Sequence, residues 1–473
     1  MFSNMETCSV PKGKHLIRPG SILTTEDTLV YYALLGASFR KIYGRIGWSQ
    51  DMVDYSYRLN GAGYPSLWVL DRFKGWENFR IKSVAKLKKY SHVVVADIAA
   101  FYENIDLSRL VSEVKSLGVP SAEVELLSKA LNRWASTSGR GLPQGCIPSD
   151  ILAKLYMDSI DKALKNKGYD HYRYVDDIRI FCNSEQEAKQ AIIDLAILLR
   201  EKGLSLQSSK TQICNREEAV KEIEEVQPII IGLLQKLKKD PLELLLTDSA
   251  DEVQMLEELG ETDINTVHIK IIREAFESFF VKAQYKFDKT LFRFLLRRLY
   301  KEQDDYAVAY CASSLLVHPE ETEVILKYFT EVKEATSLKI VENYICSIDA
   351  LYEYQNYQLI EWLNKQKMIS SRQLLARVRQ IAFNASSPYY LRSVAMDFMG
   401  KHGDSADLDQ LEKLCKASNG LEQTKLMCTL EMLEKSRRNG LFKRLEDAAF
   451  HNKSAIVYVA NNENQALKTK TCK

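Results

Sequence analysis

The sequence has few of the features that mark secreted, zinc-binding or membrane proteins. Its nine cysteines are scattered, odd in number and never spaced as Cys-x-x-Cys, which argues against a disulfide framework or a zinc site and for a reducing compartment. Residues 1–11 are polar and lack the apolar core of a signal peptide. No uninterrupted apolar run approaches the roughly 20 residues of a membrane helix. We therefore expect a soluble, cytoplasmic protein with no membrane partner.

A strong net charge is also missing. The 65 Lys and Arg residues nearly balance the 63 Asp and Glu residues, so the formal net charge is +2. No global basic field therefore indicates nucleic acid, and any such surface must come from a local concentration of basic residues. The 46% of hydrophobic and 27% of charged residues are typical of a globular protein. A length of 473 residues allows two or three domains.

The chain changes character about halfway along. In the first half, strand patterns alternate with helical patterns, which predicts an α+β domain with an antiparallel sheet covered by helices on one face. From residue 264 onwards, strand patterns nearly disappear and short amphipathic helices follow one another. We expect an α+β domain over residues 1–230, a connector over 231–263 and an all-helical domain over 264–473. The helical domain fits either a HEAT-like repeat or an irregular bundle, because no strict period is present.

Two adjacent carboxylates interrupt a predicted β-hairpin. Asp176 and Asp177 lie between 171–175 and 178–181, two short runs rich in aromatic and β-branched residues, which are typical of strands. A tight turn would more readily use Asn-Gly or Asp-Gly, because neighbouring like charges repel. An Asp-Asp pair is also common in a solvated turn, so the pair alone does not indicate a function.

A third carboxylate follows a predicted buried strand. The three valines of 93–95 indicate this strand, and Asp97 ends it, where the sheet can bring it close to Asp176. These carboxylates are hard oxygen ligands with no histidine or thiolate nearby in the sequence, and such a set selects Mg²⁺ or Mn²⁺. Two such ions about 3.5–4 Å apart can activate a 3′-hydroxyl and stabilise a leaving pyrophosphate. The sequence thus indicates a two-metal site for nucleotidyl transfer.

Other residues could complete such a site. Tyr102, five positions after the first carboxylate, could lie beneath an incoming sugar or could be a core aromatic. The loop around Gln144 and Gly145 is rich in Gly and Pro, which allows the backbone to approach a nucleotide closely. Ser149 is expected to cap the helix that follows this loop. Lys210 could support the pyrophosphate electrostatically or could be an ordinary solvated lysine.

Arg58 and Lys74 lie in two clusters that mix basic and aromatic residues. Such clusters suit contacts to phosphates and bases. However, Lys and Arg beside buried aromatic rings commonly extend along them towards solvent. The sequence favours neither interpretation.

Four motifs in the chain resemble, in the same order, motifs A to D of reverse transcriptases. They are Asp97-Ile98-Ala99-Ala100-Phe101-Tyr102, Leu142-Pro143-Gln144-Gly145-x-x-x-Ser149, Tyr174-Val175-Asp176-Asp177 and Gly203-Leu204-x-Leu206-x-x-x-Lys210-Thr211. A single Tyr-x-Asp-Asp is a weak signal, whereas four ordered motifs at compatible spacing are a strong one. The resemblance covers roughly residues 50–215, and it departs from the family at Gln207, where Asn is common.

The resemblance implies a fingers-palm domain, with an antiparallel palm sheet and helices, followed by the helical half of the chain. Asp97 and Asp176 would bind two catalytic Mg²⁺ ions, and Asp177 would assist them. The backbone carbonyl of Ile98 is a further candidate ligand. An aromatic residue at Tyr102 would exclude the ribose 2′-OH, so the substrates would be dNTPs. The remaining candidates for nucleotide binding are Phe101, Gln144, Gly145, Arg58 and Lys74, and Lys210 is the remaining catalytic candidate.

The segments around the motifs narrow the resemblance. The chain has no segment similar to RNase H or integrase and no recognisable thumb, and a long helical half follows motif D. This layout resembles that of bacterial abortive-infection and defence-associated (unknown group) reverse transcriptases. The resemblance implies antiphage defence, assembly into homo-oligomers, and DNA synthesis that is either untemplated or directed by a non-coding RNA. Where a protein hydroxyl serves as the primer, the DNA product would stay covalently attached.

A second interpretation is that the polymerase fold is catalytically vestigial. The chain would then serve as a nucleic-acid-binding or oligomeric scaffold, with the helical half as its working part. The intact carboxylates Asp97, Asp176 and Asp177 argue against this interpretation.

Overall fold

A computed structural model gives the structure of the chain. It describes residues 2–13, 16–50, 52–61, 68–70, 72–224, 229, 266–282, 287–332, 335–366, 371–449 and 451–471. The expected connector over 231–263 lies outside the described residues. The boundaries at 230 and 264 therefore stay a prediction.

The chain divides into two compact units. Unit 1 comprises Met1–Thr7 and Pro19–Leu299, and unit 2 comprises Cys8–Arg18 and Tyr300–Lys473. Strands β1 (Glu6–Pro11) and β2 (Ile17–Ile22) pair in a separate two-stranded sheet.

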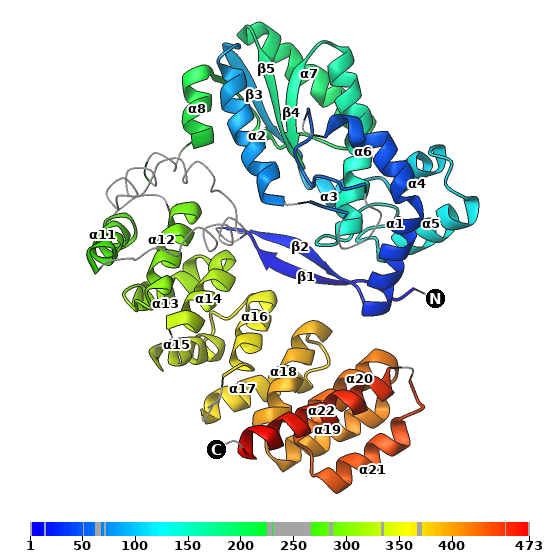
Figure 1. Ribbon diagram of the computed structural model, residues 1–473, viewed down its shortest axis with the longest axis vertical. Helices are drawn as coiled ribbons and strands as arrows, with labels where there is room; N and C mark the ends of the chain where they lie inside the picture. Colours follow the sequence, from blue (N-terminus) through cyan, green and yellow to red (C-terminus); the bar gives the residue numbers. More distant parts are fainter. Residues whose placement is uncertain are drawn as a thin grey trace. The chain divides into compact units, whose positions relative to one another are not determined.

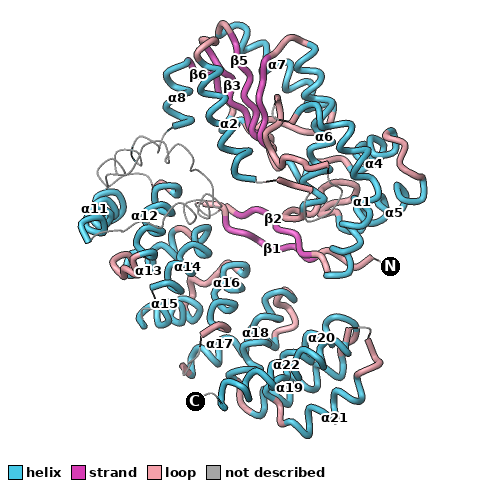
Figure 2. The backbone as a smooth tube through the Cα atoms, in the orientation of Figure 1, coloured by secondary structure: helices cyan, strands magenta, loops and turns pink. Residues whose placement is uncertain are grey.

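Unit 1 has the α+β fold that the sequence predicts. Four strands, β3 (His92–Asp97), β4 (Asp170–Tyr174), β5 (Asp177–Cys182) and β6 (Gln212–Asn215), form an antiparallel sheet in the order β4-β5-β3-β6. Its helices are α1 (Thr25–Ile46), α2 (Arg72–Leu87), α3 (Phe101–Asn104), α4 (Leu107–Ser116), α5 (Ser121–Trp134), α6 (Ile147–Asn166), α7 (Glu185–Glu201), α8 (Arg216–Glu224), α11 (Thr266–Phe276) and α12 (Lys289–Lys301). Figure 1 and Figure 2 show the four-stranded sheet with helices on either side.

Helices cover both faces of this sheet, so the expectation of one covered face is wrong. Residues such as Val94 and Ile180 pack into the main core together with helices α6 and α7. The residues that alternate with them along the strands, such as Val93 and Phe181, pack in a second cluster with helices α2 and α8. Successive side chains of a strand point to opposite faces, and both sets are apolar here. The sheet edge that carries the carboxylates is thus held on two sides.

One local prediction for unit 1 also differs from the structure. Helix α6 begins at Ile147 with Cys146 as its N-cap, so Ser149 is not the cap. Ser149 is buried instead, and its hydroxyl oxygen lies 2.9 Å from that of Tyr31 in a hydrogen bond. The helix begins two residues before Ser149, with Pro148 in its first turn, so Ser149 lies inside that turn and not at the N-cap position.

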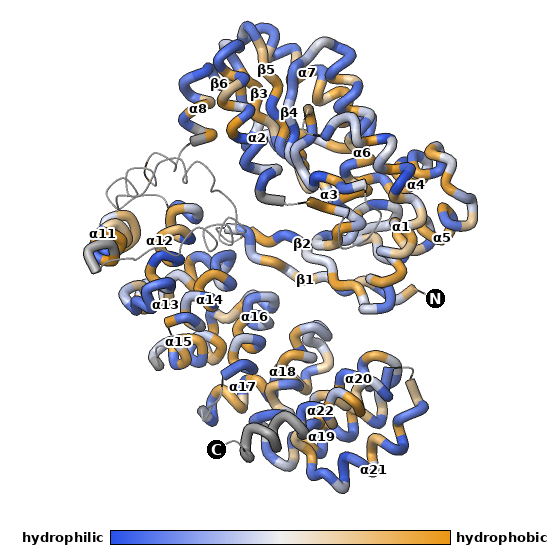
Figure 3. The backbone as a smooth tube through the Cα atoms, viewed as in Figure 1, coloured by the Kyte–Doolittle hydropathy of each residue, from blue (hydrophilic) through white to orange (hydrophobic). Residues whose placement is uncertain are grey.

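Unit 2 contains only helical elements among its described residues after Tyr300. Its α-helices are α13 (Val308–Val317), α14 (Thr322–Val332), α15 (Ala335–Cys346), α16 (Glu353–Leu363), α17 (Arg372–Phe383), α18 (Tyr389–His402), α19 (Ser405–Ala417), α20 (Gly420–Thr429), α21 (Lys435–Leu445) and α22 (Asn452–Thr471). From α13 to α16, each helix contacts the second one after it along the chain, and α18, α20 and α22 continue this stacking. In Figure 3, hydrophobic and hydrophilic segments alternate along these helices, as expected for helices with one buried face. This stacking is what a helical repeat requires, and a HEAT-like repeat stays a prediction.

Membrane-spanning helices are not found in the described part of the chain. None of its helices combines the length and the apolar character that crossing a bilayer requires.

Candidate active site

The two central strands of the sheet bring two acidic residues directly opposite each other. Asp97 ends β3, Asp177 begins β5, and the two are partners in the antiparallel register. Residues directly opposite in such a pair have Cβ atoms about 4.5–5.5 Å apart. The sheet therefore holds the two carboxylates side by side on rigid elements, as the sequence predicts for Asp97 and the Asp-Asp hairpin.

The turn between β4 and β5 presents the third acidic residue. It consists of Val175 and Asp176, and Val175 has a φ of 56°. A β-branched residue in this left-handed region costs on the order of 1–3 kcal/mol, so its surroundings must hold it there. On the side of β3, the amide of Ile98 donates to the carbonyl of Asp176 over 3.2 Å. The turn thus stays next to the end of β3.

The three carboxylates repel one another. Burial raises the pKa of Asp177 from its ordinary 3.8 to about 7, and the charges of Asp176 and Asp97 contribute to the rise, while Lys210 and Arg179 oppose it. A hydrogen bond of 2.7 Å joins the Lys210 ammonium to Asp97 Oδ1. Burial lowers the pKa of Lys210, but this bond and the charges of the three acids outweigh burial and raise it. The three acidic residues therefore carry more negative charge than their basic neighbours balance, and a cation would relieve this excess.

The donor set fits divalent metal ions of the Mg²⁺ type. It consists of carboxylate oxygens and nearby backbone carbonyls, which are the ligands that Mg²⁺ and Mn²⁺ prefer. In the described residues, no three or more His, Cys, Asp or Glu side chains form a ready-made metal cluster. The placement of Asp97 opposite Asp177, with Asp176 in the adjoining turn, is the observation that favours a cation at this edge of the sheet.

Tyr102 is fixed close to this edge by contacts at both ends. It lies in the short helix α3, its carbonyl accepts from the amide of Leu142 over 3.0 Å, and its hydroxyl donates to Asp150 Oδ1 over 2.7 Å. Burial, followed by the charge of Asp150, raises the pKa of Tyr102 well above its ordinary value, and a hydrogen bond with Tyr57 adds to the rise. The sequence points to Tyr102 but not to Asp150, because their contact joins elements 48 positions apart.

The glycine-rich loop lies between Leu142 and the start of α6. The amide of Gln144 donates to the hydroxyl of Ser21 over 2.9 Å. Gly145 has a φ of 91° with open space where a Cβ would lie, so only glycine adopts this conformation easily. Phe101 is buried, 4% exposed, and its ring packs edge-on against that of Tyr102. The structure thus gives Phe101 a place behind Tyr102, while the backbone at Gly145 stays open.

The remaining candidates lie on other elements. Lys74 is exposed on helix α2, and Arg58 is half-buried in the segment that follows Tyr55. Gly75, next to Lys74, packs so tightly that an added Cβ would lie 2.4 Å from the Tyr55 carbonyl. This close packing places helix α2 against the segment that leads to Arg58. Their contacts to a nucleotide stay predictions.

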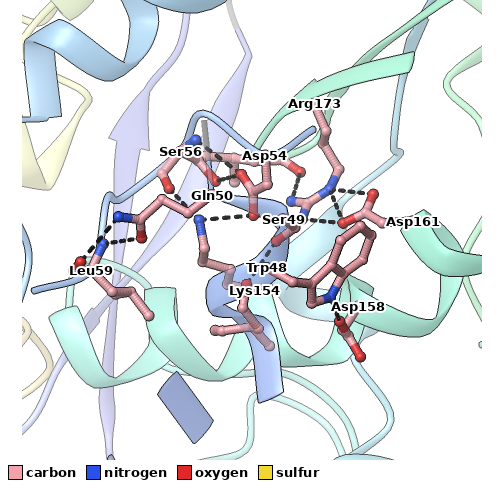
Figure 4. A network of polar contacts seen from close by, with 12 residues as sticks. Trp48, Ser49, Gln50, Asp54, Ser56, Leu59, Lys154, Asp158, Asp161 and Arg173 are labelled. Carbon is pink, nitrogen blue, oxygen red and sulfur yellow. Dashed lines mark hydrogen bonds and ion pairs between the residues drawn. The ribbon is translucent and has the colours of Figure 1, made fainter. Parts of the chain in front are cut away.

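A buried polar network supports the hairpin that carries Asp176, and the sequence did not predict it. Figure 4 shows its centre, the guanidinium of Arg173 between Asp54 and Asp161. Lys154 extends it through Asp54 over 2.9 Å, and His171 lies 3.4 Å from Asp161. All five side chains are buried. The only signal in the sequence was that charged residues such as Lys154 and Asp161 interrupt the apolar pattern of one helix.

Residues 55–254 match the model of a protein family described as reverse transcriptase (RNA-dependent DNA polymerase). The matched segment includes every candidate site residue named above. It covers less than half of the chain, so the finding is that the chain contains a reverse-transcriptase domain. The helical residues that follow it lie outside the match.

Other known proteins add little to this. No curated protein sequence matches the chain. Among solved structures, the chain is similar to a telomerase from Candida albicans that was solved in complex with a fragment of telomeric RNA, with 10% identity and a TM-score of 0.34. The similarity covers 78% of this chain and 67% of the telomerase chain. A likeness this weak carries no argument about function.

Proposed function

We propose that the reverse-transcriptase domain of this chain is an active, metal-dependent DNA polymerase that acts in antiphage defence. One observation carries the proposal: Asp97 and Asp177 are cross-strand partners, and Asp176 lies in the adjoining turn. A structural role for three acidic residues at one edge would be unfavourable, because each charge raises the cost of the others. A cation-dependent reaction gives this arrangement a purpose.

Each residue of the proposed site would have a role that follows from its position. Asp97, Asp176 and Asp177, with the backbone carbonyl of Ile98, would hold two Mg²⁺ ions, or Mn²⁺ in their place. When bound, the ions supply activation of the 3′-hydroxyl and neutralise charge on the phosphates. Lys210 pairs with Asp97, and with metal ions bound its ammonium would support the pyrophosphate. The protein then has only to align the reactants on rigid strands.

The nucleotide would lie against the anchored Tyr102. With its ring fixed by Asp150 and backed by Phe101, Tyr102 would exclude a ribose 2′-hydroxyl and select dNTPs. Gln144 and Gly145 would contact the nucleotide or its paired base through the open loop. Arg58 and Lys74 would contact phosphates of the nucleotide or the template.

The biological setting belongs to the same proposal. DNA synthesis would be untemplated and primed by a protein hydroxyl, which leaves the product attached, or else directed by an associated non-coding RNA. The chain would assemble into homo-oligomers in the cytoplasm. The α+β domain of residues 1–230 would carry the chemistry, and the helical domain of residues 264–473, joined by the connector 231–263, would be a HEAT-like interaction domain.

The first experiment tests polymerase activity. Purified protein is incubated with labelled dNTPs and Mg²⁺, and the product is compared between the wild type and Asp176→Ala. Asp170→Asn is the matched control, because Asp170 lies at the other end of the same hairpin and is exposed. The proposal expects DNA from the wild type and from Asp170→Asn but none from Asp176→Ala. Equal synthesis by Asp176→Ala would overturn the assignment of the carboxylates, and the scaffold function would then be the better account.

A second experiment separates the modes of synthesis. The product made without added nucleic acid is sequenced, and the protein is denatured to find DNA that remains attached. A product that tracks a co-purified RNA indicates templating, whereas homopolymeric or random tracts without RNA indicate untemplated synthesis. Attached DNA indicates a protein primer.

A further inference from the structure

We infer that Arg173 is a positioning residue that holds the turn carrying Asp176, acting through the backbone of Val175. The inference rests on the proposed polymerase function. It is argued from the hydrogen bonds that the N–H groups of this buried guanidinium donate to two carboxylates and to the turn.

Most of these N–H groups bind the two flanking carboxylates. The Nε atom of Arg173 donates to Asp161 Oδ1 over 3.0 Å, and a terminal nitrogen donates to Asp161 Oδ2 over 2.7 Å. The same terminal nitrogen donates to Asp54 Oδ2 over 2.6 Å. Figure 4 shows that the two carboxylates approach the guanidinium from different sides. Asp161 comes from helix α6 and Asp54 from the segment that follows α1, so Arg173 is fixed by two separate elements.

The other terminal nitrogen leaves the ion pair and binds the turn. It donates to the carbonyl of Val175 over 3.1 Å. Val175 is the residue with a φ of 56°, and Asp176 follows it directly. A left-handed β-branched residue persists only where its surroundings determine its conformation. The Arg173 side chain is one such determinant, and the bond from the Ile98 amide to the Asp176 carbonyl is another.

The backbone of Arg173 is fixed as firmly as its side chain. Its amide donates to the carbonyl of Val53 over 2.7 Å, and its carbonyl accepts from the amide of Tyr55 over 2.9 Å. Asp54 lies between these two residues and binds the guanidinium of the same arginine. Strand β4 therefore cannot shift along this segment without breaking backbone and side-chain bonds together.

The charged groups of the buried network pair with one another, so its net charge is close to zero. Lys154 donates to the carbonyl of Ser56 over 2.6 Å and pairs with Asp54, so two cations face two carboxylates beside His171. Arg173 is 1% exposed, so water does not replace a lost donor easily. A lysine at this position would keep the charge but not the planar fork, and it could not bind both carboxylates and the turn at once.

A plain structural ion pair is the competing account, and the chain offers a matched control for it. Lys154→Met breaks the same buried network but removes no bond to the turn. Both Arg173→Lys and Lys154→Met should lower the melting temperature. If Arg173 positions the turn, only Arg173→Lys should also change how the site uses Mg²⁺, which a general loss of stability would not do.

The test measures dNTP incorporation at saturating dNTP against Mg²⁺ concentration, for soluble full-length protein below its melting transition. For Arg173→Lys we expect a maximal rate lower by about 10- to 100-fold and a higher half-maximal Mg²⁺ concentration, because small displacements of reacting groups have effects of this size. For Lys154→Met we expect the half-maximal Mg²⁺ concentration of the wild type. Identical Mg²⁺ profiles for Arg173→Lys and the wild type would overturn the inference.

A rescue experiment tests the route through Val175. Glycine adopts a left-handed conformation without strain, so Val175→Gly should reduce the dependence of the turn on Arg173. We expect the rate loss caused by Arg173→Lys to be at least about threefold smaller in the Val175→Gly background than in the wild type. Equal losses in both backgrounds would show that Arg173 does not act through this turn.

A second variant covers the case in which Arg173→Lys does not fold. The charge-balanced pair Arg173→Gln with Asp161→Asn then takes its place, with the same expectations. An inactive wild type would contradict the proposed function, whereas an active wild type with an unaltered Arg173→Lys profile would contradict only the role of Arg173.

Discussion

Two groups of charged residues meet at the β4–β5 hairpin, which contributes Arg173 to one group and Asp176 and Asp177 to the other, and their charges are arranged in opposite ways. The buried network of Arg173, Lys154, Asp54 and Asp161 balances its charges and satisfies them with hydrogen bonds. The group of Asp97, Asp176 and Asp177 has three carboxylates, and the ammonium of Lys210 is bonded to Asp97. In the balanced network, the main free-energy cost is that of removing its charges from water. The three carboxylates also repel one another, which is unfavourable without a bound cation. The difference separates a group that stabilises the fold from the group that we propose as the metal site.

The largest effect on stability should come from breaking the balanced network. Asp161→Ala leaves the Arg173 guanidinium without its main partner in a buried site, which typically costs about 3–5 kcal/mol of the free energy of unfolding. Denaturant unfolding with EDTA present measures this loss. Asp177→Asn is the counterpart in the unbalanced group, and it should leave the free energy of unfolding equal or higher, because it removes a repelled charge. Similar losses for both variants would contradict the distinction between the two groups.

A smaller effect is expected at the contact that fixes Tyr102. Asp150→Leu removes the acceptor of the Tyr102 hydroxyl, whereas Asp150→Asn keeps an acceptor oxygen at that position. A loosened ring should exclude the 2′-hydroxyl less well, so we expect Asp150→Leu to raise rNTP incorporation relative to dNTP incorporation about tenfold, the equivalent of about 1.4 kcal/mol. Asp150→Asn should stay close to the wild type. Ser149→Ala, at the preceding position of the helix, is the control for packing. An equal change in rNTP incorporation by Ser149→Ala would show that Asp150 does not act by fixing Tyr102.

The smallest effect is the dependence of stability on pH in the absence of metal. The pKa of Asp177 is raised from 3.8 to about 7, so between these two values the folded protein holds a proton that the unfolded chain has released. This contribution stabilises the fold at low pH and is lost as the pH rises through about 7. Between pH 6 and pH 8, with EDTA present, the wild type should therefore lose about 1 kcal/mol more of its free energy of unfolding than Asp177→Asn. Parallel pH profiles for the two proteins would show that the carboxylates do not repel one another as described.

Much of the site follows from local sequence, and the parts that do not are long-range. The valine run predicted the strand before Asp97, and the apolar residues around the Asp-Asp pair predicted the hairpin. The family model and the α+β fold confirm the resemblance at the level of a reverse-transcriptase domain. By contrast, the bond between Arg173 and Asp54 joins residues 119 positions apart, and that between Tyr102 and Asp150 joins residues 48 apart. Neither pair has a spacing that sequence periodicity can show.

The wrong predictions have the same origin. Ser149 is a good helix cap by local preference, but helix α6 begins at Ile147, and the Ser149 hydroxyl bonds to that of Tyr31, 118 positions earlier. The second covered face of the sheet is packed by helices α2 and α8, and most residues of α8 are charged, so its sequence did not indicate a buried face. Local sequence thus points to candidate site residues, but it does not show which distant residues hold them in place.

The most direct test of the central claim is the rate of dNTP incorporation by Asp97→Asn at saturating Mg²⁺. This substitution keeps the size of the side chain and removes one ligand charge. The account predicts a rate lower than that of the wild type by about 10³-fold or more, with an unchanged or higher free energy of unfolding, because the carboxylate serves the metal rather than the fold. A rate within about twofold of the wild type would contradict it, since effects of that size are below what a lost metal ligand causes.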